Sequence, residues 1–169
     1  RMLADDDDLS EDRLYRVGRW LATRAADREA VKAGIAVLGL FRSAEGHAIV
    51  DQRGRHDEFS LYAGVALSNT AEDGDGAVWD LARAVHGWGR IHLVEHLIDT
   101  DDDRIKAWLI RQGYRNTVLI DYLAHACASA GDLRRALDQP SVTLDDELRR
   151  GAADLILSLI HISEPTRPL

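Results

Sequence analysis

The chain has 169 residues, of which 46% are hydrophobic, and its formal net charge is −8. A chain of this size can bury the core of one domain, and its negative charge argues against a protein that binds nucleic acid by electrostatics alone. Its one cysteine, Cys127, excludes an intrachain disulfide, and no apolar run reaches the length of about 18 residues that a membrane helix needs. The sequence therefore predicts a cytoplasmic protein without a membrane segment.

Apolar residues at helical spacing predict a series of helices along the chain. In chain order they are Glu11–Ala25, Glu29–Phe41, His47–Arg53, Glu58–Asn69, Ala77–His86, Ile91–Ile98, Arg104–Gln112, Thr117–Ala128, Leu133–Leu137 and Asp145–Ile156. No stretch alternates apolar and polar residues for long enough to predict a strand, and Thr117–Ile120 is the best candidate. The sequence predicts an all-α fold.

The two ends of the chain differ from the region between them. Residues 1–10 contain the acidic run Asp5–Asp8, which predicts a disordered acidic end. The segment Leu157–Arg167 resembles a translated sequencing adaptor. We therefore expect a helical domain over residues 11–156 and a non-native tail over residues 157–169, in a metagenomic fragment of a longer protein.

The predicted helices repeat with a period of about 30 residues. One column of mostly apolar positions is spaced by 29, 30, 29 and 29 residues: Trp20, Ile49, Trp79, Trp108 and Leu137. A second column keeps the same intervals: Leu38, Leu67, Leu97, Ala126 and Leu155. Such self-similarity predicts stacked pairs of antiparallel helices in a right-handed α-solenoid. Because repeat folds mostly present binding surfaces, it also lowers the expectation of catalysis.

The period and the helix pairs resemble HEAT-like repeats of the armadillo/HEAT type, in particular their short bacterial form, over Glu11–Ile156. Trp88–Glu95 and Trp108–Asn116 also look like segments of HEAT-repeat proteins from GC-rich bacteria. The resemblance implies a bacterial interaction scaffold and supplies no reaction and no cofactor.

A polar column marks three turns of the repeat. Its members are Thr70-x-x-Asp73, Thr100-x-x-Asp103 and Ser129-x-x-Asp132. A hydroxyl can accept a hydrogen bond from a free amide of the first helical turn, and an acid three residues later favours the positive helix N-terminus. We therefore predict that the threonine and serine hydroxyls cap the helices that follow.

His92, Glu95 and His96 match the H-x-x-E-H pattern of inverted zinc peptidases. That chemistry needs both histidines on one helix face, the glutamate as general base and a third ligand, for which Glu147 is the downstream candidate. The alternative is an ordinary polar face, opposite the apolar face of the same helix. The motif thus predicts a second possible function, that of a zinc-dependent hydrolase. If the protein is a scaffold instead, no metal site is expected.

Glu95 stands in an otherwise apolar register column. The equivalent positions of the other repeats are Ala36, Val65 and Ala124. A buried acid must be paired, because an unpaired buried charge is costly. We therefore expect a buried ion pair with one of three arginines: Arg90, Arg111 or Arg115.

Arginines form a column of their own. Arg24, Arg53 and Arg83 follow one another at intervals of 29 and 30 residues. Arg111 lies one position from where the next member of this column would fall. If these helices line a concave surface, the arginines form a ladder for an acidic peptide or a phosphate backbone. The alternative is that they interact with the negative ends of helix dipoles, which needs no partner.

The tryptophans divide into two groups. Trp20, Trp79 and Trp108 share the apolar column, so we predict core anchors between neighbouring helices. Trp88 falls outside the column, between two glycines, and is the better candidate for an exposed contact. Cys127 is expected in the core.

The sequence thus predicts a non-enzymatic scaffold that binds a protein or peptide, with an acidic partner among the candidates. Nucleic acid, membrane and cofactors are not expected, and the oligomeric state is left open. The predicted partner-binding residues are Arg53, Arg83, His86, Trp88, Arg90 and Arg111.

Overall fold

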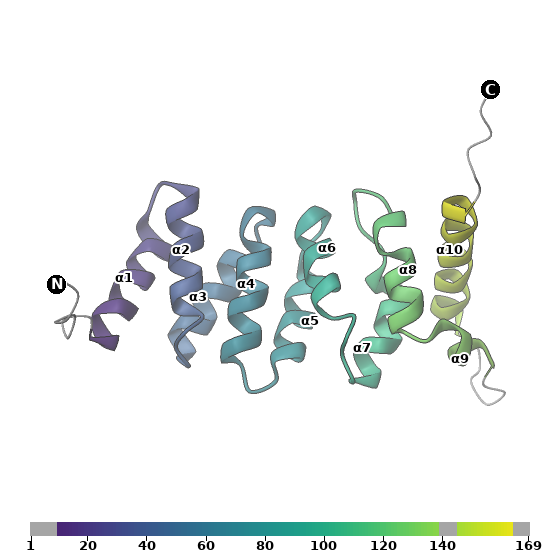
Figure 1. Cartoon of the computed structure of the whole chain (residues 1–169), viewed down its shortest axis with the longest axis horizontal. Coiled ribbons are helices and arrows are strands. Elements are labelled where there is room, and N and C mark those ends of the chain that lie inside the picture. The colour runs from purple at the N-terminus through teal and green to yellow at the C-terminus, as the bar shows by residue number, and fades with distance from the viewer. Residues whose placement is uncertain (1–9, 139–144, 164–169) are drawn as a thin grey trace, which may run out of the picture. The chain divides into compact units, whose positions relative to one another are not determined.

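The structure is a computed structural model, and it describes residues 10–138 and 145–163 (Figure 1). These residues form ten α-helices and one π-helical turn, and they contain no strand. The predicted all-α fold is confirmed. No helix among the described residues has the length and hydrophobicity to cross a bilayer. Residues 1–9 of the predicted acidic end lie outside the described residues.

The chain divides into two compact units, Arg1–Leu81 and Ala82–Leu169, with the boundary inside α5. The helices up to this boundary are α1 (Glu11–Arg24), α2 (Arg28–Leu38), α3 (Ala44–Gly54), α4 (Asp57–Thr70) and α5 (Gly74–Ala84). The later elements are α6 (Gly87–His96), α7 (Asp103–Trp108), the π-helical turn η1 (Leu109–Gly113), α8 (Asp121–Ala130), α9 (Leu133–Asp138) and α10 (Asp146–Ser163).

Several predicted helix boundaries differ from the structure, including three in the second half of the chain. The helix predicted over Arg104–Gln112 ends in the π-helical turn, and the helix predicted from Thr117 begins only at Asp121. Asn116 explains the later start. Its Oδ1 accepts hydrogen bonds from the backbone amides of Val118 and Leu119, both at 2.8 Å, and these bonds compete with helix formation. α10 continues beyond Ile156 to Ser163. A non-native origin of the tail stays a prediction.

In the first unit, α1 packs on α2, α3 packs on α4, and α2 also contacts α4 (Figure 1). Leu38 and Leu67 are each 1% exposed and form part of the core between these helices. The contact between α1 and α2 is close at Gly34. A Cβ built there would lie against the Ala22 amide nitrogen and 2.8 Å from the Gly18 carbonyl oxygen. The two backbones approach so closely that only glycine fits.

In the second unit, α10 packs on η1 and α8, and α8 packs on α6. A Cβ built on Gly151 of α10 would fall on the carbonyl oxygen of Ile110, so this contact also depends on glycine. Cys127 of α8 is fully buried, as predicted, and burial raises the pKa of its thiol to about 12.

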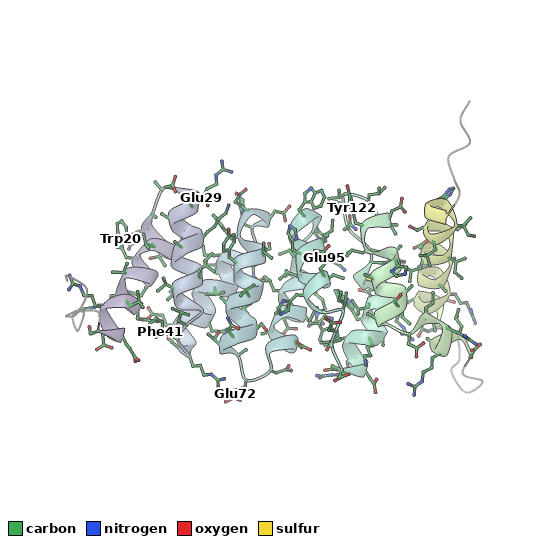
Figure 2. The ribbon with its side chains drawn as sticks, viewed as in Figure 1. Trp20, Glu29, Phe41, Glu72, Glu95 and Tyr122 are labelled. Carbon is green, nitrogen blue, oxygen red and sulfur yellow. The ribbon has the colours of Figure 1, made fainter. Side chains whose placement is uncertain are left out.

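The two register columns differ in burial. The second column lies mostly in the core, because Leu38, Leu67, Leu97 and Leu155 are buried and Ala126 is half-buried. The first column is core only in part: Trp108 is buried and Trp79 is half-buried, but Trp20 is 59% exposed. Figure 2 shows Trp20 on the side of α1 that faces away from α2, where no described helix covers it. Its predicted role as a core anchor is wrong.

Serine hydroxyls cap α1 and α3, but at the three predicted positions the helices that follow are capped by aspartates rather than by the predicted hydroxyls. The hydroxyl of Thr70 donates to the Ala66 carbonyl at 2.7 Å, and Asp73 instead accepts from the Gly76 amide at 2.8 Å. The aspartates that accept first-turn amides of α7 and α9 are Asp102 and Asp132. A carboxylate interacts more favourably with the positive helix end than a hydroxyl does, and a threonine hydroxyl can bond to the preceding turn instead.

We expect Asp73→Ala to lower the free energy of unfolding by about 1 kcal/mol, because the Gly76 amide loses its acceptor. The matched control is Thr70→Val, which removes the hydroxyl at the predicted cap and should change stability by less than about 0.5 kcal/mol. Urea denaturation followed by circular dichroism measures both. An equal loss in the two variants would contradict the aspartate cap.

Candidate functional site

The predicted partner-binding residues fall in both units. Arg53 lies in the first unit, and the others, Arg83, His86, Trp88, Arg90 and Arg111, lie in the second. Arg53 donates through Nη2 to the Thr23 carbonyl, 3.1 Å away in the last turn of α1. This contact fits the alternative in which the arginine interacts with a helix C-terminus. A ligand-binding arginine ladder stays a prediction.

Arg111 has partners within its own unit. Its Nη2 lies 2.9 Å from Asp145 Oδ2, and its Nη1 donates to the Ala107 carbonyl at 3.1 Å. The guanidinium lowers the pKa of Asp145 below its usual value. Arg83 and His86 are exposed. Arg111 therefore connects η1 to the start of α10, and its charge is already compensated.

The H-x-x-E-H residues lie on the polar face of α6. His92 is half-buried, Glu95 and His96 are exposed, and Ile91 and Val94 of the same helix are buried. Within residues 10–138 and 145–163, no group of three or more His, Cys, Asp or Glu side chains is arranged to hold a metal ion. The predicted third ligand, Glu147, accepts a hydrogen bond from Gln112 at 3.0 Å. The three residues thus lie on the polar face of α6, and a zinc-dependent hydrolase stays a prediction without geometric support.

Glu95 does not form the buried ion pair that its register predicts. Its side chain is 55% exposed, and its Oε2 lies 3.4 Å from Nδ1 of His92 rather than near an arginine (Figure 2). Ala36 and Val65 of the same register column are exposed as well. Three of the four positions of this column are therefore exposed and only Ala124 is buried, so an apolar column in the sequence need not face the core.

A pocket of about 300 Å³ lies at the N-terminal end of α6. Its lining comes from that helix end, from η1 and from the loop that follows: His86, Arg90, Gln112, Arg115, Asn116 and Thr117. Two of these residues, His86 and Arg90, are predicted partner-binding residues. The structure thus brings part of the predicted set together with four residues that were not predicted to bind a partner.

Arg90 is the unusual residue of this pocket, because it is only 7% exposed. Its Nη2 donates to the Gln112 carbonyl at 2.9 Å, and its guanidinium carbon lies 5.3 Å from the centre of the Trp108 ring. No carboxylate pairs with it in the described part of the chain, and its buried Nε finds no acceptor there. Burial lowers the pKa of Arg90 as a result. Arginine is almost never buried so deeply without a counter-ion.

The second arginine of the pocket, Arg115, is compensated. Its Nε donates to the Tyr114 hydroxyl at 2.9 Å, and its Nη2 lies 3.6 Å from Asp154. The Tyr114 hydroxyl in turn donates to Asp154 at 2.6 Å. Tyr114 is fully buried, and this burial together with the bond to Asp154 raises the pKa of Tyr114 to about 12. The buried tyrosine thus holds Arg115 at the pocket.

Aromatic side chains meet on the surface of the same unit. The ring centres of Trp88 and Tyr122 are 5.1 Å apart, and those of Trp88 and His92 are 6.3 Å apart. Trp88 is 48% exposed and Tyr122 is 54% exposed, so the predicted exposure of Trp88 is confirmed. Tyr122, labelled in Figure 2, belongs to the first turn of α8. No sequence signal separates it from an ordinary helical aromatic residue.

The first unit carries a separate apolar groove of about 380 Å³ along α2 and α4. It is lined by Ala36, Gly39, Leu61, Tyr62, Val65, Ala66 and Asn69. The apolar residues of α4 lie on two sides of the helix, since Leu67 is buried whereas Leu61 and Val65 are exposed.

Comparison with known proteins identifies no family for the chain. No family model matches it, and neither a curated protein nor a solved structure does. The predicted HEAT-like identity and the predicted bacterial origin therefore gain no support from relatives.

Proposed function

We propose that the chain is a non-enzymatic helical-repeat scaffold that binds a segment of a partner protein. In this proposal the helices form antiparallel HEAT-like pairs of a right-handed solenoid. The period of about 30 residues in the sequence and the packing of α1 on α2 and of α3 on α4 support the repeat. The binding surface lies in the second unit, around Trp88 and Tyr122.

The contact between Trp88 and Tyr122 carries this proposal. Single exposed apolar residues are normal, but here two aromatic rings touch each other and remain about half exposed. Val118 and Leu119, in the segment before α8, are exposed too. Tryptophan and tyrosine are enriched at binding hot spots, because each buries a large area with few rotatable bonds.

The chemistry around this surface favours a peptide segment. His86 and Arg90 flank Trp88 in sequence and line the pocket at the end of α6. A peptide segment with an apolar side chain and an acidic side chain can therefore contact the aromatic surface with the first and the pocket with the second. The net charge of −8 disfavours a nucleic-acid backbone as the ligand, as in the sequence analysis.

Peptides selected from a random phage-displayed library on the full chain provide the test. We expect fluorescence anisotropy to show that Trp88→Ala weakens the selected peptides about thirtyfold, the effect of a hot spot worth ~2 kcal/mol. Tyr122→Ala should weaken them in the same direction. The matched control is Trp20→Ala, which removes an even more exposed tryptophan from the first unit and should leave affinity unchanged.

Two results would overturn the proposal. The first is a selection that yields no binding peptide, or peptides that Trp20→Ala and Trp88→Ala weaken equally. The second is cleavage of a bound peptide on incubation with the protein, detected by mass spectrometry, because a scaffold returns its ligand intact.

A further inference from the structure

The pocket at the end of α6 contains a cation that no described residue neutralises. Arg90 lies beneath the surface with its guanidinium against the Trp108 ring, and its one hydrogen bond is to a neutral carbonyl. Nη1 makes no hydrogen bond to the described residues and, unlike Nε, is reached by solvent. A buried charge is costly unless it is paired, so an anion that enters the pocket would recover part of that cost.

The start of α6 adds a second feature that favours an anion. His86 occupies the N-cap position of this ten-residue helix, but its side chain makes no capping hydrogen bond. Side chains cap the N-termini of α2, α4 and α7, whereas α6 and α8 have no side-chain cap. The positive end of a helix dipole attracts anions, and His86 at the N-terminus of α6 lines the same pocket as the uncompensated Arg90.

We propose that this pocket binds the carboxylate of an acidic side chain, aspartate or glutamate, in the partner segment. This inference rests on the proposed function, since it names the chemistry of the peptide that the scaffold binds. Arg90 supplies the charge-assisted hydrogen bond, the positive end of the α6 dipole favours the negative charge, and Trp88 packs against the neighbouring residue of the peptide.

The charge of the pocket selects a carboxylate over a phosphate. Of its two arginines, Arg115 is already paired with Asp154, so one cation remains uncompensated. A carboxylate carries one negative charge, whereas a phosphate monoester carries between 1.5 and 2 at about pH 7. The volume of about 300 Å³ is at the lower end for ligand sites and suits one side chain.

The test uses the full chain and small probes that contain no peptide. N-acetylglutamic acid amide presents one side-chain carboxylate, and N-acetylglutamine amide is its neutral isostere. In ¹H–¹⁵N NMR titrations we expect the carboxylate to shift the amides of residues 87–90 and the Nε–H of Arg90 to saturation. The glutamine probe should leave these signals in place, and phenyl phosphate should bind at least threefold more weakly than the carboxylate.

Variants assign the effect to the buried arginine. Arg90→Met removes the guanidinium that lies over the Trp108 ring but keeps an unbranched apolar side chain, and it should reduce carboxylate affinity at least tenfold. Arg149→Met is the matched control, because it removes an arginine of the same unit that Asp146 already neutralises, and carboxylate binding should persist. Circular dichroism verifies that both variants fold. If Arg90→Met does not fold, the contrast between the acid and its isostere on the unmodified chain still decides the question.

Three outcomes overturn the inference: no saturable shift with the carboxylate, equal shifts with the neutral isostere, or phosphate binding at least as tight as carboxylate binding. Failure of this pocket is distinguishable from failure of the scaffold. Selected peptides that bind through Trp88 while the carboxylate probe does not bind would refute the acidic pocket alone. A carboxylate that binds while no peptide is selected would refute the scaffold alone.

Discussion

Substituting alanine for Gly151 is expected to lower the free energy of unfolding by about 2 kcal/mol. The new Cβ would fall on the carbonyl oxygen of Ile110, and the Cα of Arg111 would be only 3.3 Å away. These are backbone atoms of η1, so no side-chain rotation can relieve the contact. Alanine gains about 1 kcal/mol of helix propensity over glycine, but overpacking against a fixed backbone costs about 3 kcal/mol and prevails.

The matched control for Gly151→Ala is the same change at a site with space. A Cβ on Gly46 of α3 would lie 3.6 Å from its nearest neighbours, which is an ordinary contact. Gly46→Ala is therefore expected to stabilise the chain, by up to about 1 kcal/mol. Urea denaturation followed by circular dichroism measures both variants. A Gly151→Ala variant as stable as Gly46→Ala would contradict the packing of α10 on η1.

Gly34→Ala should destabilise the first unit to a similar extent, by about 2 kcal/mol. Its Cβ would meet the Gly18 carbonyl oxygen and the Leu21 Cβ, both at 2.8 Å, as well as the Ala22 amide nitrogen. Two of these atoms belong to the backbone of α1 and the third is a Cβ, so none of them can rotate away. The added methyl group therefore forces α1 and α2 apart. Thermal unfolding is expected to show a melting temperature lower by roughly 4 to 8 °C.

The control for Gly34→Ala is a small change on the exposed side of the same helix. Ala33→Ser alters α2 without entering the contact with α1, and we expect a stability change within about 0.5 kcal/mol. If Gly34→Ala unfolds at the same temperature as Ala33→Ser, the close approach of α1 and α2 is wrong.

Local periodicity was sufficient to predict the helices, because each helix carries its own apolar face. The helix predicted over Glu58–Asn69 is α4, Asp57–Thr70, and the helix predicted over Glu11–Ala25 is α1, Glu11–Arg24. The aspartate caps were harder to predict. Threonine and aspartate are both good capping residues, and only the structure shows which of them meets the free amide.

Burial was less predictable than helix position, because it depends on what lies on the other side of each helix. Trp20 and Glu95 share register columns with buried residues, yet both are exposed. The candidate pocket also depends on packing far along the chain. Arg90 is buried by a loop and a π-helical turn about 22 residues later, and Tyr114 bonds to Asp154 across 40 residues. No local pattern contains that information.

The burial of Cys127 provides a direct measure of the dynamics of α8. It is the only cysteine in the chain, and a thiol with a pKa of about 12 and no exposed surface does not react with alkylating reagents while the helix is packed. Modification at neutral pH therefore requires α8 to open. The rate at which a maleimide labels Cys127 reports the free energy of that opening in the unmodified protein. The measurement concerns the second unit alone and needs no denaturant.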